Sequence, residues 1–168
     1  NGPTGKLIRE EMKIARLTFN PFQENTYVLW DETGEAVVVD AGNYTSKETE
    51  ALRGFIEEKG LRPVLAVNTH GHVDHMLGVQ AVKELYGIPF ALHPDDGFLI
   101  ESAPMHGKMY GFRVEAVPAV ERTLAHGDEV AFGRTRLQVI HTPGHTPGHV
   151  CLFLPEEKIL LTGDTLFR

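Results

Sequence analysis

The sequence predicts an α/β fold, with one domain whose sheet is at least partly buried on both faces. Strand and helix patterns alternate in the first half of the chain, and a run of strand patterns follows in the second half. The 168 residues, of which 42% are hydrophobic and 23% charged, suffice for one domain with a substantial core. Side chains that can bind a metal follow several predicted strands, which is where such sheets carry their active sites.

Three strands open the predicted fold, over residues 13–19, 25–31 and 35–42. The first of them alternates in hydrophobicity, and the segment ETG between the other two is a hairpin signal. A helix is predicted next over residues 45–60. Thr45 or Ser46 can cap its start, and Gly60 ends it.

A histidine-rich segment then lies between a strand and a helix. Residues 63–70 (PVLAVNTH) form a nearly continuous hydrophobic run, as expected of a strand buried on both faces. The helix is predicted over residues 76–87. The rest of the chain is predicted to form a strand over 88–93, a short helix starting near Pro94, a long irregular connection over 102–126, and strands over 129–142, 149–155 and 158–164.

The composition argues against several classes of partner. A net charge of −7 disfavours a polyanion-binding surface, so no nucleic-acid partner is expected. No run of about 18 hydrophobic residues occurs, so no membrane span is expected. With a single cysteine, Cys151, no disulfide framework can form within the chain, so a reducing compartment, the cytoplasm, is expected. Cys151 lies in a strand pattern and is interpreted as a buried packing residue. Residues 1–11 lack a signal-peptide core and are interpreted as an N-terminal tail or expression remnant.

The segment VNTHGHVDHMLG concentrates metal ligands at the end of a predicted strand. His70 and His72 are two residues apart on extended chain, so their side chains point the same way. Two such imidazoles are two of the three protein ligands of a typical catalytic zinc site. Asp74 and His75 follow at the turn into the helix and could bind a second ion. We therefore interpret the segment as a metal site; an ordinary polar turn is the alternative.

The remaining ligands are expected from the strand-rich second half. His141, His145 and His149 are candidates for the third histidine, and we favour His145, which the Pro-Gly pairs on either side present in a loop. Asp164 follows a hydrophobic strand and can bridge two ions. Non-ligand roles are expected for the other histidines of the chain, namely His93, His106, His126, His141 and His149.

These motifs resemble those of the metallo-β-lactamase superfamily. THGHVDH matches its H-x-H-x-D-H signature, and VVVDAG, TPGHTPGH and TGDTLF occur in the expected order around it. Residues 12–168 are similar to the short glyoxalase II-like (hydroxyacylglutathione hydrolase-like) hydrolases of this superfamily. The resemblance implies an αββα four-layer sandwich with metals at one edge of the two sheets.

The resemblance also implies a binuclear centre, with zinc as the expected metal and iron or manganese as alternatives. It assigns His70, His72 and His145 to the first ion and Asp74 and His75 to the second. Asp164 would bridge the two ions. Asp40 would lie beneath the centre and orient the ligands.

Members of the superfamily continue past the motif GDTLFR with further strands and helices and a late histidine. We therefore expect the domain over residues 12–168 to be incomplete at its C-terminus, without the last strands and helices. An open sheet edge there would favour pairing with another chain or a homo-oligomer.

The expected function is metal-dependent hydrolysis of a small-molecule thioester by metal-activated hydroxide, with Asp74 orienting the nucleophile. One alternative is a mononuclear iron persulfide dioxygenase that uses His70, His72 and one further ligand. The other is a truncated, non-catalytic metal-binding chain.

Overall fold

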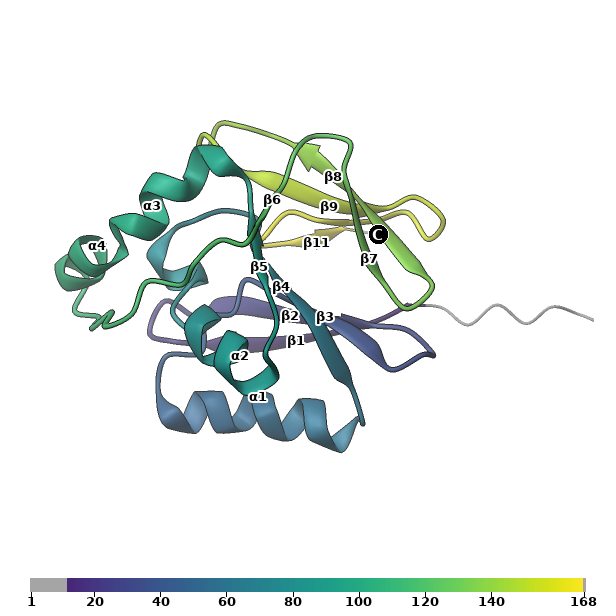
Figure 1. The fold of residues 1–168 in the computed structure, drawn as a ribbon, viewed down its shortest axis with the longest axis horizontal. Helices are drawn as coiled ribbons and strands as arrows, with labels where there is room; N and C mark the ends of the chain where they lie inside the picture. The colour runs from purple at the N-terminus through teal and green to yellow at the C-terminus, as the bar shows by residue number, and fades with distance from the viewer. Residues whose placement is uncertain (1–11, 168) are drawn as a thin grey trace, which may run out of the picture.

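The computed structural model describes residues 12–167, which form two β-sheets packed face to face (Figure 1). The first sheet has six strands in the order β1 to β6, and the second has five in the order β11-β10-β9-β8-β7. The tail predicted over residues 1–11 lies outside the described residues.

The first sheet comprises β1 (Lys13–Phe19), β2 (Glu24–Trp30), β3 (Glu35–Val39), β4 (Arg62–Val67), β5 (Phe90–Leu92) and β6 (Arg122–Thr123). Its first three strands are antiparallel, whereas β3 to β6 are parallel. Parallel neighbours end at the same edge of a sheet. The residues that follow β3, β4 and β5 therefore come together, although the sequence separates them widely.

All helices of the described chain occur between β3 and β6. They are α1 (Ser46–Glu58), η1 (Val73–His75), α2 (Val79–Tyr86), η2 (Pro94–Asp96), α3 (Gly97–Glu101) and α4 (Ala103–Met109). Thr45 and Glu48 form a capping box at the start of α1, so Thr45 and not Ser46 is the residue that caps this helix. Leu52 and Ile56 of α1 are buried in a hydrophobic core that lies between the helices and the first sheet.

The second sheet is antiparallel throughout and comprises β7 (Glu129–Phe132), β8 (Thr135–His141), β9 (Val150–Leu154), β10 (Ile159–Leu161) and β11 (Leu166–Phe167). Buried and exposed residues alternate along β7, so one face of the sheet points inward. That face and the first sheet enclose the second hydrophobic core, which contains Val37, Val67, Leu137 and Leu152.

Residues 12–167 thus provide three layers, one of helices and two of strands (Figure 1). They contain no helix that covers the outer face of the second sheet. No helix in this part of the chain is long and hydrophobic enough to cross a membrane.

Two segments differ most from their predictions, and the short strand β11 at the end of the described chain was not predicted. The single strand expected over residues 129–142 is a hairpin, because Gly133, with a φ of 56°, begins a two-residue turn between β7 and β8. The irregular connection expected over residues 102–126 contains α4 and the short strand β6. The glycines and prolines of this segment weaken its helical pattern, so α4 was not predicted. Pro104 nevertheless occupies an early helical position, where proline is tolerated.

A buried carboxylate joins the two sheets at the end remote from the histidines. Asp31, 4% exposed, accepts hydrogen bonds from the backbone N–H of Thr33 at 3.0 Å and of Arg134 at 2.8 Å. It also accepts from the hydroxyls of Thr33 at 2.5 Å and Thr135 at 2.8 Å. Burial alone would raise the pKa of Asp31, but these hydrogen bonds outweigh it and hold the pKa below its usual value.

Replacement of Asp31 by Ala should lower the free energy of unfolding by about 2–3 kcal/mol, because buried donors lose a charged acceptor. The folded-state pKa is lower than the unfolded one, so this stabilisation is complete above pH ~4 and is lost as the pH falls through the folded-state pKa. Urea denaturation at pH 7 and at low pH measures both effects.

Glu32→Gln is the matched control, since it breaks only the exposed ion pair between Glu32 and Arg134 in the same region. It should change stability by less than about 1 kcal/mol. Equal stabilities of the Asp31 and Glu32 variants would contradict the role of Asp31.

Candidate metal centre

Three histidines that lie apart in the sequence converge at the common edge of the sheets. His70 and His72 follow β4, and His145 lies in the loop between β8 and β9. Ring nitrogens of the three, one from each, lie within 4.8 Å of one another. The structure therefore brings together the three residues that the sequence assigned to the first ion.

The imidazole of His70 has one buried nitrogen without a hydrogen-bond partner in the described structure. The side chain is 1% exposed, and its Nδ1 lies 3.0 Å from the hydroxyl of Thr69. The unpartnered nitrogen is Nε2. Burial and the surrounding histidines lower the pKa of His70, which keeps the ring neutral and a lone pair available. A buried polar atom without a partner is costly, and a metal ion would satisfy it.

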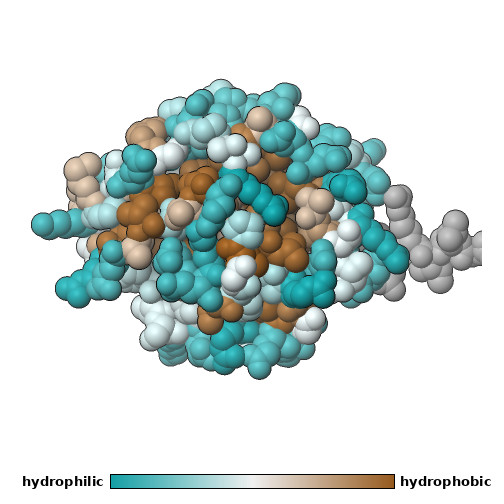
Figure 2. All heavy atoms as spheres, viewed as in Figure 1, coloured by the Kyte–Doolittle hydropathy of each residue, from teal (hydrophilic) through white to brown (hydrophobic). Residues whose placement is uncertain are grey.

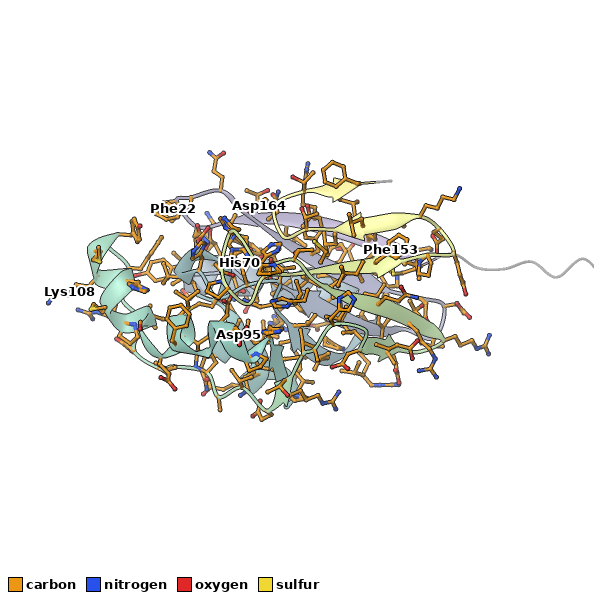
Figure 3. All side chains as sticks on the ribbon, turned by 90° about the horizontal axis from the view of Figure 1, so that it is seen from above. Phe22, His70, Asp95, Lys108, Phe153 and Asp164 are labelled. Carbon is orange, nitrogen blue, oxygen red and sulfur yellow. The ribbon has the colours of Figure 1, made fainter. Side chains whose placement is uncertain are left out.

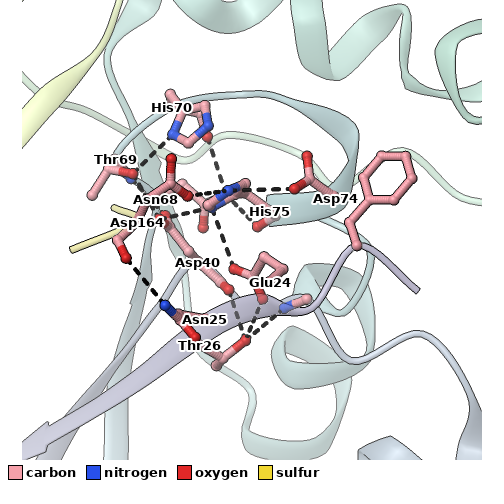
Figure 4. Close-up of polar contacts among 12 residues, drawn as sticks. Glu24, Asn25, Thr26, Asp40, Asn68, Thr69, His70, Asp74, His75 and Asp164 are labelled. Carbon is pink, nitrogen blue, oxygen red and sulfur yellow. Dashed lines mark hydrogen bonds and ion pairs between the residues drawn. The ribbon is translucent and has the colours of Figure 1, made fainter. Parts of the chain in front are cut away.

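A second group of side chains that can bind a metal lies beside the first (Figure 4). Nε2 of His75 lies 3.5 Å from a carboxylate oxygen of Asp74 and 3.2 Å from one of Asp164. Burial disfavours a charged imidazole, but hydrogen bonds with Asp164 and Asp40 outweigh it and raise the pKa of His75 to about 11. The same contact with His75 lowers the pKa of Asp164.

Asp40 lies beneath this second group, as the resemblance implies. One carboxylate oxygen accepts from the backbone N–H of Thr69 at 2.7 Å. The other accepts from the Thr69 hydroxyl at 2.7 Å and lies 3.1 Å from Nδ1 of His75. Asp40 therefore orients the His75 ring with Nε2 toward Asp74 and Asp164, and it fixes the end of β4 just before His70.

Glu24, a buried carboxylate at the start of β2, was not expected from the sequence to contribute to the site. One of its oxygens accepts from the Thr26 hydroxyl at 2.8 Å, and the other lies 3.3 Å from Nδ1 of His75. Burial raises the pKa of Glu24 well above its usual value. Nothing in the sequence signals this role, because Glu24 precedes a predicted strand and belongs to no motif.

Asp96, also missed, connects the two loops that present the histidines. Its side chain is fully buried and accepts from the backbone N–H of Gly71, between His70 and His72, at 2.9 Å. It also accepts from the Thr146 hydroxyl at 2.6 Å and the Gly148 N–H at 2.7 Å, just after His145. Asp96 thus sets the separation of the first two histidines from the third.

The other histidines have different surroundings. Both ring nitrogens of His149 lie within hydrogen-bond distance of protein oxygens, those of Thr142 and Thr162. Ligand atoms of His93, Asp95 and His141 also lie within 4.8 Å of one another. However, the His93 and His141 rings stack at 4.1 Å with only 15° between their planes, so their lone pairs lie in nearly parallel planes and do not meet at one point. The non-ligand roles expected for these histidines stay predictions.

Comparison with known proteins agrees with this arrangement. Residues 19–168 match the sequence pattern of the metallo-beta-lactamase superfamily. The chain is 37% identical over 160 residues to an uncharacterized protein of Aquifex aeolicus, covering 94% of this chain and 72% of that protein. It is 31% identical over 159 residues to hydroxyacylglutathione hydrolase GloC of Haemophilus influenzae, covering 94% and 73%. The solved structure of TTHA1623 in a di-iron-bound form has a TM-score of 0.78 and 35% identity, covering 92% of this chain and 73% of that one.

The chain therefore belongs to the metallo-β-lactamase superfamily. Within it, the clustered histidines and aspartates place the protein among the metallo-hydrolases. It spans about three quarters of the length of the relatives named above.

The donor set fits a metal in both groups. Three imidazoles around one point suit zinc, iron or manganese. Around His75, the carboxylates of Asp40, Asp74 and Asp164 gather more negative charge than one imidazolium can balance. A cation at this place would relieve that repulsion.

Replacement of Asp96 by Ala should weaken zinc binding by about tenfold to a hundredfold, because the loops bearing His72 and His145 lose their common acceptor. A competition titration against a chromophoric chelator measures the affinity, and circular dichroism confirms that the variant folds.

Asp95→Ala is the matched control, because this neighbouring carboxylate is 57% exposed and contacts neither loop glycine. Zinc affinity equal to that of the unmodified protein in a folded Asp96→Ala variant would refute the positioning role.

Proposed function

We propose that the protein hydrolyses thioesters at a binuclear metal centre formed by His70, His72 and His145 on one side and Asp74, His75 and Asp164 on the other. The observation that carries the proposal is the buried, unpartnered Nε2 of His70 among converging imidazoles, beside a second group of carboxylates and histidine. Similarity to a hydroxyacylglutathione hydrolase supports a thioester as substrate.

The bound metals would lower the pKa of a water molecule toward neutrality and polarise the thioester carbonyl. Asp74, half-buried beside His75, would accept a hydrogen bond from that water and orient it toward the acyl carbon. Attack at this carbon breaks the carbon–sulfur bond. An ordinary thiol has a pKa of about 8.5, so the sulfur can leave as thiolate without a dedicated general acid.

No serine or cysteine nucleophile is needed for this reaction. Cys151 is 6% exposed, lies in β9 and has its Sγ 3.4 Å from the Thr142 hydroxyl. It is therefore assigned a packing role rather than covalent catalysis. A buried free thiol accords with the reducing compartment, the cytoplasm, that we propose for the protein.

A mononuclear iron persulfide dioxygenase is the second candidate. The group of His70, His72 and His145 favours it, because three ligands suffice for a single iron and leave open positions for substrate and oxygen. Iron content with oxygen consumption on glutathione persulfide would select this function over thioester hydrolysis.

Chelation should abolish release of thiol from S-lactoylglutathione, and added zinc should restore it, because the proposed reaction depends on metal-activated water. A chromogenic thiol reagent follows the reaction, and elemental analysis reports the metal content. Hydrolysis that persists in chelator after complete metal removal would refute the proposal.

His72→Ala should lower kcat/KM at least about a hundredfold by removing a ligand. His126→Ala is the matched histidine control, because His126 is exposed and its Nδ1 only accepts the backbone N–H of His141. Its activity should be unchanged.

A further inference from the structure

A pocket of about 420 Å³ opens beside the candidate metal centre, and His72 and Asp74 form part of its wall. We infer that this pocket binds the acyl group of the substrate and selects an uncharged, hydrophobic one. The inference rests on the proposed thioester hydrolysis and adds the substrate class to it.

The rest of the pocket wall is mainly hydrophobic, and His106 of α4 is its one polar side chain among the described residues. Met105 and Met109 come from α4, Tyr110 follows that helix, and Phe22 comes from the loop between β1 and β2. The Phe22 and Tyr110 rings meet edge to face with centroids 5.3 Å apart, so loop and helix form one surface.

Exposed hydrophobic side chains of the described chain are concentrated in this pocket wall. Eight large hydrophobic side chains are exposed in residues 12–167, and four of them line this one pocket: Phe22, Met105, Met109 and Tyr110. On the face shown in Figure 2, hydrophobic side chains gather across the middle of the surface and extend toward the position of α3 in Figure 1. Hydrophobic groups concentrated beside reactive polar ones are typical of a ligand pocket.

The charge of the wall indicates which part of a thioester enters. No lysine or arginine of the described chain lines the pocket. Lys108, although on α4, points outward from the far end of the helix, away from His70 (Figure 3). A thiol such as glutathione carries carboxylates, which would lose their hydration against the methionines and aromatic rings of this wall without gaining a lysine or arginine partner. The acyl group therefore enters the pocket, and a charged thiol stays toward solvent.

The first test compares thioesters that share the uncharged thiol N-acetylcysteamine and differ in acyl group. With zinc-loaded protein, kcat/KM should rise about threefold to fourfold per methylene from acetyl through butyryl to hexanoyl. Succinyl, similar in length to butyryl but charged, should be a poorer substrate than butyryl. Equal kcat/KM for acetyl and hexanoyl would overturn the inference.

Met109→Lys tests the pocket itself. It should lower kcat/KM for the hexanoyl thioester about tenfold and raise it for the succinyl thioester, because a cation replaces a hydrophobic wall. Leu85→Lys is the matched control: Leu85 is 45% exposed on α2 and does not line the pocket, so the order of substrates should not change. The same shift in both variants would contradict the assignment.

A binding experiment distinguishes the hydrophobic acyl pocket from the proposed thioester hydrolysis. The chain has four methionines, and hexanoate should shift the methyl NMR signals of Met105 and Met109 but not those of the buried Met12 and Met76. Shifted signals without hydrolysis of any thioester would support the hydrophobic pocket and refute thioesterase activity. Hydrolysis without a chain-length preference or a shift would refute the pocket instead.

Discussion

The candidate metal centre depends on the carboxylate of Asp40. Its two oxygens hold the backbone and hydroxyl of Thr69 and the ring of His75, so a single side chain after β3 sets both the end of β4 and the orientation of a ligand. Asp40 has a φ of 54°, a left-handed conformation that aspartate tolerates better than most residues. The hydrogen bonds around it offset the strain of that conformation.

Hydrogen bonds between residues far apart in the sequence also join other segments that meet at the site. Asp96 receives donors from the loops on both sides of it, and Asn25 of β2 donates to the carbonyl of Asp164 at 3.1 Å. Glycines permit these close approaches, since a Cβ on Gly148 would lie 2.7–2.9 Å from atoms of Asp96. The two hydrophobic cores position the strands, and buried carboxylates then position the loops between them.

The polar centre and the hydrophobic pocket share His72 and Asp74 but are built from different parts of the chain. Strand ends supply the centre, whereas α4, the residue that follows it and the loop after β1 supply most of the pocket wall. A substrate held between them would place its carbonyl near the metals and its acyl group against Met105 and Met109. Substitutions in α4 could therefore change which acyl group the pocket binds without moving the candidate metal ligands at the strand ends.

The sequence by itself determined the α/β class, most of the strands and the superfamily, because the ligand motifs are local and each follows a hydrophobic strand pattern. It also singled out all of the histidines and aspartates now found together around His70 and His75 except Asp96, whose neighbours in the chain form no motif. Only the tertiary structure decided the parts that depend on contacts across long separations. Glu24 and Asp96 look ordinary in the sequence, since their importance comes from burial against segments tens of residues away. The hairpin of β7 and β8 and the helix α4 were likewise missed, because short elements rich in glycine or proline carry weak local patterns and are stabilised mainly by packing.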